Sequence, residues 1–138
     1  MSPETSRPDA ALRALRPAVP TETAEPGTIG AFLHATLRPV LKLQNELLLA
    51  VVADFVRDHH IALRPTDAQP QLAELLTRNL KLRFTVVGLA SGLFTSEEYA
   101  FYGRHRSELN RRLLELAQRR VLDQAGRVVA LAAGELPG

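Results

Sequence analysis

The chain has 138 residues, and 46% of them are hydrophobic, which is enough for one domain with a buried core and too few for two. Its 17 Lys plus Arg and 15 Asp plus Glu give a formal net charge of +2, so charge alone does not indicate a nucleic-acid-binding protein. The absence of cysteine excludes disulfides, thiol nucleophiles and thiolate metal ligands.

The first residues contain prolines and acids where a secretory signal has a basic start and an apolar run, so we expect a cytoplasmic protein. The longest apolar run, residues 47–53, is far shorter than the roughly 20 residues that span a bilayer. No membrane span is therefore predicted.

Residues 1–27 are predicted to be a disordered tail, because they hold more than half of the nine prolines and few long apolar side chains. Within this tail, residues 9–16 favour one or two helical turns. Such a segment is typical of a docking peptide that folds in a partner's groove, although the same composition also arises without a function. Leu12, Leu15 and Arg16 are its candidate partner-binding residues.

Residues 28–138 are predicted to form a single helical domain. Apolar side chains recur at helical spacing from residue 28 to 56, and they cover a face wide enough for two neighbours, or for one neighbour and a second copy. This width indicates self-association, with Leu48 and Val52 as candidate contacts. Pro39 removes a backbone hydrogen bond, so we expect a kink or a new helix start near it.

A second helix is predicted to begin at Asp67 or Pro70, and a third to run from residue 96 to about 123. Thr95 and Glu98 have the spacing of a capping box, which marks the start of the third helix. The fold class is therefore all-α, with three helices, an antiparallel helical hairpin over about 70–123 and a disordered N-terminal tail. Phe94 is expected to pack against Tyr99 at the corner of the hairpin.

Two short segments leave an α+β alternative open. Residues 80–87 alternate with period two, and residues 127–132 form a short apolar run, so each is compatible with a strand. A continuous helix over 80–87 needs fewer assumptions, because helical spacing runs on either side and no turn signal separates residues 76 and 80.

Gly88 and Gly92 place small residues at i and i+4, where another backbone can approach closely. They are candidate self-association residues, with close packing inside the hairpin, or a helix end at Gly92, as the alternative. Tyr99 and Tyr102 fit either a buried corner or an aromatic anchor that faces a partner.

Helix 104–120 is rich in arginine and carries the other candidate partner-binding residues, namely Arg104, Arg106, Arg111 and Arg112. Acidic residues lie among them at spacings that pair opposite charges, so the arginines form either a binding stripe or a self-paired surface.

The sequence contains no convincing Ser/His/Asp order, phosphate-binding glycine loop, paired carboxylates or metal-ligand spacing, so we predict no catalytic residue, metal or cofactor. The predicted function is that of a non-enzymatic helical adaptor or regulatory interaction protein that forms a homo-oligomer, such as a dimer, and recruits a protein partner. One alternative is a module that binds nucleic acid or an acidic ligand through helix 104–120. Another is a small enzyme in which Arg78, Arg83 and Arg112 converge on one cavity.

Overall fold

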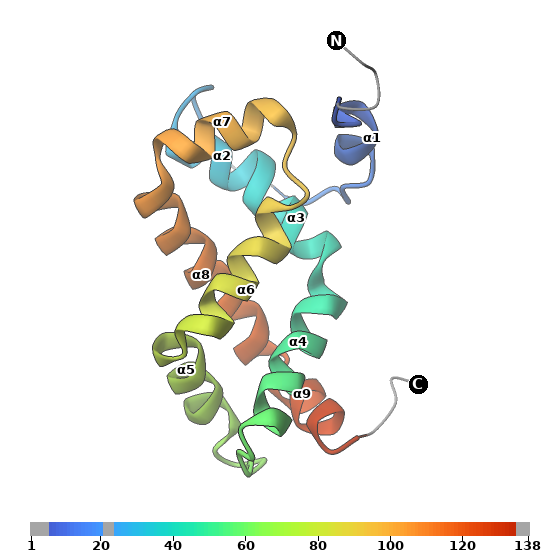
Figure 1. The fold of residues 1–138 in the computed structure, drawn as a ribbon, viewed down its shortest axis with the longest axis vertical. Coiled ribbons are helices and arrows are strands. Elements are labelled where there is room, and N and C mark those ends of the chain that lie inside the picture. The colour runs from blue at the N-terminus through green and yellow to red at the C-terminus, as the bar shows by residue number, and fades with distance from the viewer. Residues whose placement is uncertain (1–5, 21–23, 135–138) are drawn as a thin grey trace.

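The computed structural model describes residues 6–20 and 24–134, and over these residues the chain is helical, with no strand. The elements are α1 (Asp9–Ala14), α2 (Ile29–Phe32), the π-helical turn η2 (Leu33–Leu37), α3 (Arg38–Leu43), α4 (Asn45–Asp58), α5 (Ala68–Arg78), α6 (Leu80–Ser91), α7 (Ser96–Arg104), α8 (Arg106–Asp123) and α9 (Ala125–Ala132) (Figure 1). The all-α prediction is confirmed, and the count of three helices is wrong. The α+β alternative is also wrong, because 80–87 lies in α6 and 127–132 in α9.

The first predicted helix is interrupted where Pro39 was expected to interrupt it. Thr28 caps α2 by accepting a hydrogen bond from the Ala31 N–H at 3.1 Å. The π-helical turn η2 then comes directly before α3, whose first turn contains Pro39. A proline removes the i to i−4 hydrogen bond and crowds the preceding carbonyl, and a wider turn accommodates both effects. A second break follows at Gln44, whose φ of −91° and ψ of 10° separate α3 from α4.

The second predicted helix begins after Asp67 as expected but is divided at Asn79. Asn79 leaves the helical conformation, with φ −85° and ψ 104°, and its side-chain oxygen accepts a hydrogen bond from the Leu82 N–H at 2.9 Å. It therefore ends α5 and caps α6. The third predicted helix is likewise divided at His105, where φ is −128° and ψ is 31°. The two-helix hairpin is not confirmed; α6 and α8 pack together and run in opposite directions, with α7 between them in the chain (Figure 1).

Helix α8 lies at the centre of the fold and contacts η2, α3, α4, α5, α6, α7 and α9. Its buried stripe repeats every four residues and consists of Leu109, Leu113, Ala117 and Val121, all fully buried. Leu48 and Val52 of α4 belong to the same core. Among the described residues, no helix is both long and apolar enough to cross a membrane.

Part of the predicted tail has a defined place in the structure. Residues 6–20 include α1, which lies beside the junction between α6 and α7 (Figure 1). Disorder of the tail is thus not confirmed for this part, because Arg16 and its neighbours bond to the domain. Residues 1–5 and 21–23 of the predicted tail, and 135–138 of the predicted domain, lie outside the described residues.

Candidate functional site

The capping box predicted at the start of α7 is present. Thr95 accepts a hydrogen bond from the Glu98 N–H at 3.2 Å, and the Glu98 carboxylate accepts one from the Thr95 N–H at 2.8 Å. The Phe94 ring contacts Phe32 and Tyr102, with centroids 5.5 and 5.6 Å away, and not Tyr99 as expected. The junction between α6 and α7 therefore packs against an aromatic residue of α2, Phe32, which is far away in the sequence.

Glu98 also joins three segments of the chain. Its two carboxylate oxygens accept hydrogen bonds of 2.6 Å from the two terminal nitrogens of Arg16, and one of them accepts a bond of 2.9 Å from the Thr36 hydroxyl. The Arg16 and Glu98 side chains are only 6% and 11% exposed. Burial acts to raise the pKa of Glu98, but the bonds from Arg16, Thr95 and Thr36 outweigh it and lower the pKa to about 2.

The predicted docking peptide is occupied by these intramolecular contacts. Arg7 donates to the carbonyl oxygens of Gly92 and Phe94, and Asp9 accepts from the Ser96 N–H at 3.1 Å. Arg16 is buried against Glu98 and is therefore not free to bind a partner, whereas Leu15 remains 58% exposed. Leu12 is half-buried.

The candidate self-association residues are divided between core and surface. Leu48 and Val52 are 1% and 0% exposed, so they belong to the core and are not on the surface that a second copy would contact; this corrects the expectation from the sequence. They are buried because α9 and α8 cover the wide apolar face of α4. Gly88 and Gly92 are exposed, and Gly92 lies just past the C-terminal end of α6.

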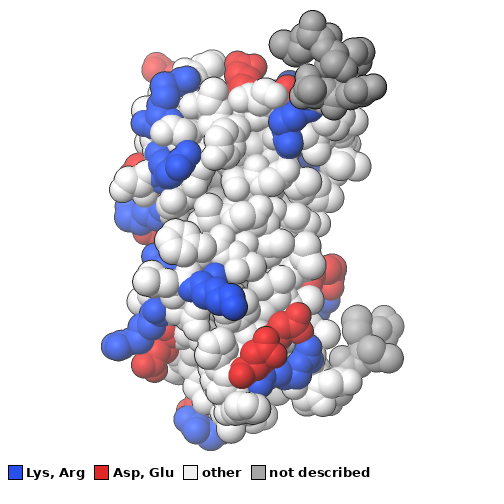
Figure 2. Space-filling view, in the orientation of Figure 1, with Lys and Arg blue, Asp and Glu red and all other residues white. Residues whose placement is uncertain are grey.

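The exposed face of α6 carries large apolar side chains that the sequence analysis did not select. Leu80 and Phe84, one helical turn apart, are 66% and 70% exposed. Gly88 follows one turn later, and a Cβ added there would meet nothing within 4 Å. Figure 2 shows that few Lys, Arg, Asp or Glu side chains lie over the middle of this side of the molecule. We call Leu80, Phe84 and Gly88 the α6 ridge.

Side-chain contacts join α6 to the two residues that flank α4, Gln44 and His59. The Gln44 amide donates to the Leu89 carbonyl oxygen at 3.0 Å, and at the other end the Asn79 amide lies 3.5 Å from His59 Nε2. Leu47, one turn after Gln44 on α4, is 46% exposed. An exposed large apolar side chain is thus present on α4 as well as on α6.

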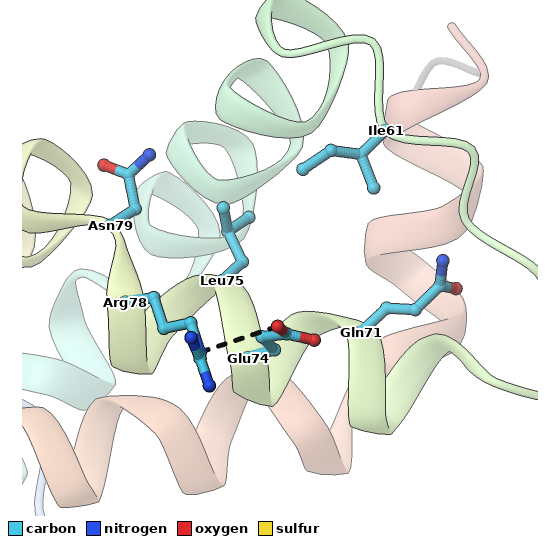
Figure 3. Close-up of a pocket in the computed structure, with 6 residues that line it drawn as sticks. All are labelled: Ile61, Gln71, Glu74, Leu75, Arg78 and Asn79. Atoms are coloured by element: carbon cyan, nitrogen blue, oxygen red, sulfur yellow. Dashed lines mark ion pairs between the residues drawn. The ribbon is translucent and has the colours of Figure 1, made fainter.

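A shallow hollow lies on α5, where the chain enters α6. It has a volume of about 390 Å³, with Ile61 and Leu75 as its apolar residues and Gln71, Glu74 and Arg78 at its rim (Figure 3). Glu74 and Arg78 form an ion pair of 3.5 Å across one turn of α5. The rim charges therefore neutralise each other, and the hollow presents an apolar floor.

The candidate aromatic and arginine residues of α7 and α8 are mostly engaged within the subunit. Tyr102 is buried and donates to Asn110, whereas Tyr99 is 48% exposed. Arg104 lies over the Phe101 ring at 5.7 Å, and Arg106 lies over the Tyr102 ring at 5.3 Å.

Two further candidates, Arg111 and Arg112, are paired with acids. Arg111 pairs with Glu108 at 2.7 Å and with Glu115 at 2.8 Å, and Arg112 pairs with Glu108 at 3.2 Å. The pKa of Glu108 is lowered by its bonds to these two arginines. This part of the helix is a self-paired surface.

The three arginines expected to converge in an enzyme do not line one cavity. Arg78 lines the hollow on α5, Arg83 lines a different depression with Arg111, and Arg112 is bonded to Glu108.

Comparison of the chain with known protein families, with characterised proteins and with solved structures gives no match.

Proposed function

We propose that this chain is a small helical interaction protein that forms a dimer through the α6 ridge and, as a dimer, recruits a protein partner. The observation that carries the proposal is the exposure of Leu80 and Phe84, at 66% and 70%, on one face of one helix. Burial of exposed apolar side chains against a partner is favourable, and exposed apolar patches mark interaction sites. The cytoplasmic location expected from the composition of the first residues belongs to the same proposal, and the lack of cysteine is compatible with it.

A second copy fits the α6 ridge because the ridge is complementary to itself. A two-fold axis between Phe84 and Gly88 sets each ring over Gly88 of the other copy, where no side chain occupies the space. Glycine within a helix costs about 1 kcal/mol relative to alanine, and close approach of another chain accounts for its presence.

Charge also favours an antiparallel pair of α6 helices. The ammonium group of Lys81, near the N-terminal end of α6, makes no ion pair among the described residues. In the dimer it lies beside the C-terminal end of the other α6, where the helix dipole is negative. The contact thus matches the ends of the helices as well as their apolar middle.

Recruitment of a protein partner rests on the exposed Leu15 and Tyr99, which remain on the surface after α1 has bound to the domain. The alternative of nucleic-acid binding through helix 104–120 has less support, because Arg111 and Arg112 are paired with Glu108 and Glu115.

Sedimentation equilibrium of the full chain tests the dimer. Phe84→Glu is expected to raise the dissociation constant of the dimer by roughly 100-fold or more, because two apolar anchors of about 1.5–3 kcal/mol each are lost. Leu15→Glu is the matched control: it makes the same charge change at another exposed apolar residue and should leave the constant unchanged. A wild-type chain that stays monomeric at high micromolar concentration, or equal effects of both variants, would overturn the proposal.

A further inference from the structure

A cleft between the η2–α3 segment and α8 gathers basic side chains from both. It has a volume of about 620 Å³, within the usual size of a small-molecule site, and is lined by Arg38, Arg119, Arg120, His34 and Asp123 among others. We call it the arginine cleft. It lies on elements that take no part in the α6 ridge.

The arginines of this cleft lack the acidic partners that neutralise the rest of α8. Arg38 reaches His34 Nδ1 at 3.4 Å, and Arg120 donates to the Asn45 side-chain oxygen at 3.3 Å; neither partner is an acid. The side chains of Arg119 and Asp123 form no hydrogen bond or ion pair with any described residue. Glu115 lies one helical turn before Arg119 and could pair with it, but it pairs with Arg111 instead.

The convergence of like charges makes the cleft favourable for an anion. Burial lowers the pKa of Arg120, and the nearby charge of Arg38 lowers it further. Three guanidinium groups and one carboxylate leave two positive charges uncompensated. A phosphate monoester has a second pKa of about 6, so near pH 7 it supplies up to two negative charges and oxygens that the planar guanidinium fork binds in pairs.

Between the charged groups, the walls of the cleft are apolar. Leu33, Leu41 and Leu116 line it together with the arginines. Leu33 and Leu116 are partly exposed, whereas Leu41 is 1% exposed. Inorganic phosphate would leave Leu33 and Leu116 uncovered, whereas an organic body attached to the phosphate would remove their surface from water. From this geometry we propose that the arginine cleft binds an organic phosphate monoester, with the phosphate on Arg38, Arg119 and Arg120 and the organic body on these two leucines.

The test is an NMR titration of the ¹⁵N-labelled full chain with phenyl phosphate. We expect the shifts to centre on residues around Arg38 and Arg119, inorganic phosphate to bind roughly tenfold more weakly, and added salt to weaken both. Arg38→Gln and Arg119→Gln should each raise the dissociation constant of phenyl phosphate roughly tenfold, because each removes charge-assisted hydrogen bonds. Arg119 is exposed, so its replacement is expected to leave the fold intact.

Arg106→Gln is the control, since it makes the same charge change on the same helix but outside the cleft, at an exposed residue that pairs with no acid among the described residues. Equal dissociation constants for Arg119→Gln and Arg106→Gln, or no saturable binding of phenyl phosphate, would overturn the proposal. Co-sedimentation with vesicles of phosphatidic acid in phosphatidylcholine that Arg119→Gln abolishes would support the site and place the phosphate on a lipid. Phe84→Glu should not change phenyl phosphate binding, so the dimer and the cleft are tested separately.

Discussion

At the scale of single residues, Glu98 links folding to pH more strongly than a surface acid does. Its carboxylate is held by Arg16, Thr36 and the Thr95 N–H, and its pKa in the folded chain is about 2, against an ordinary value of 4.5. Because the folded state binds the proton more weakly than the unfolded state, the stabilisation is complete above pH 4.5 and is lost as the pH falls towards 2.

We predict that Glu98→Gln lowers the free energy of unfolding by about 2 kcal/mol at pH 7, after allowance for solvent screening of a partly accessible ion pair. The difference from the wild type should shrink between pH 4.5 and about 2, where the wild-type carboxylate becomes protonated. Urea unfolding followed by circular dichroism at a series of pH values measures it.

The control for this prediction is Glu97→Gln, one residue earlier on α7 and exposed. It should change the free energy of unfolding by no more than about 0.5 kcal/mol, as surface replacements usually do. A pH-independent difference between Glu98→Gln and the wild type would show that the pKa of Glu98 is the same in the folded and unfolded states, against the lowered value assigned to the folded chain.

At the scale of elements, Asn79 shows how a single cap divides one apolar pattern into two helices. We predict that Asn79→Ala costs about 1 kcal/mol of the free energy of unfolding, because the Leu82 N–H loses its acceptor. Asn79→Ser keeps an N-cap oxygen while removing the contact with His59, and it should cost only a few tenths. Equal losses in the two variants, measured by urea unfolding, would assign the effect to His59 and not to the cap.

The sequence predicted well those features that depend only on residues close together in the chain. The capping box of α7 spans three residues, and Pro39 acts on its own turn, so both can be read from neighbouring residues. Asn79 was missed because the apolar spacing of α5 continues into α6 without a glycine or proline between them. The Arg16–Glu98 pair joins residues 82 apart, and the exposure of Phe84 depends on what α4 and α8 cover, so no local pattern contains either.

Helix α1 is attached to the domain chiefly by polar bonds, since none of its residues is fully buried. We predict that its amide hydrogens exchange much faster than those of α8, whose stripe is in the core. Arg16→Gln should increase exchange in α1 further, because it breaks the pair with Glu98. Hydrogen exchange followed by mass spectrometry measures this. The control is Arg13→Gln, at an exposed residue of α1 itself, and equal exchange in the two variants would contradict the prediction.

At the scale of the whole molecule, the wide apolar pattern of α4 and the apolar face of α6 differ in whether the rest of the chain covers them. The first is used inside the subunit, where Leu48 is 1% exposed, and the second remains open at Phe84. The spacing of apolar residues alone does not distinguish a buried helix face from an exposed one, because it indicates which side chains are apolar and not which element covers them. Stability and association should therefore respond to different replacements.

We predict that Leu48→Ala lowers the free energy of unfolding by about 2–5 kcal/mol, since it leaves a cavity among residues that cannot fully collapse. The dissociation constant of the folded dimer should stay as in the wild type, because the α6 ridge is untouched. Phe84→Ser should raise the dissociation constant of the dimer. At low protein concentration, where the chain is monomeric and residue 84 is exposed, it should leave the free energy of unfolding nearly unchanged. Urea unfolding of dilute protein and sedimentation equilibrium of concentrated protein separate these effects. A large loss of monomer stability in Phe84→Ser would mean that the ring is buried within its own subunit, and the α6 ridge would then have no apolar anchor to offer a second copy.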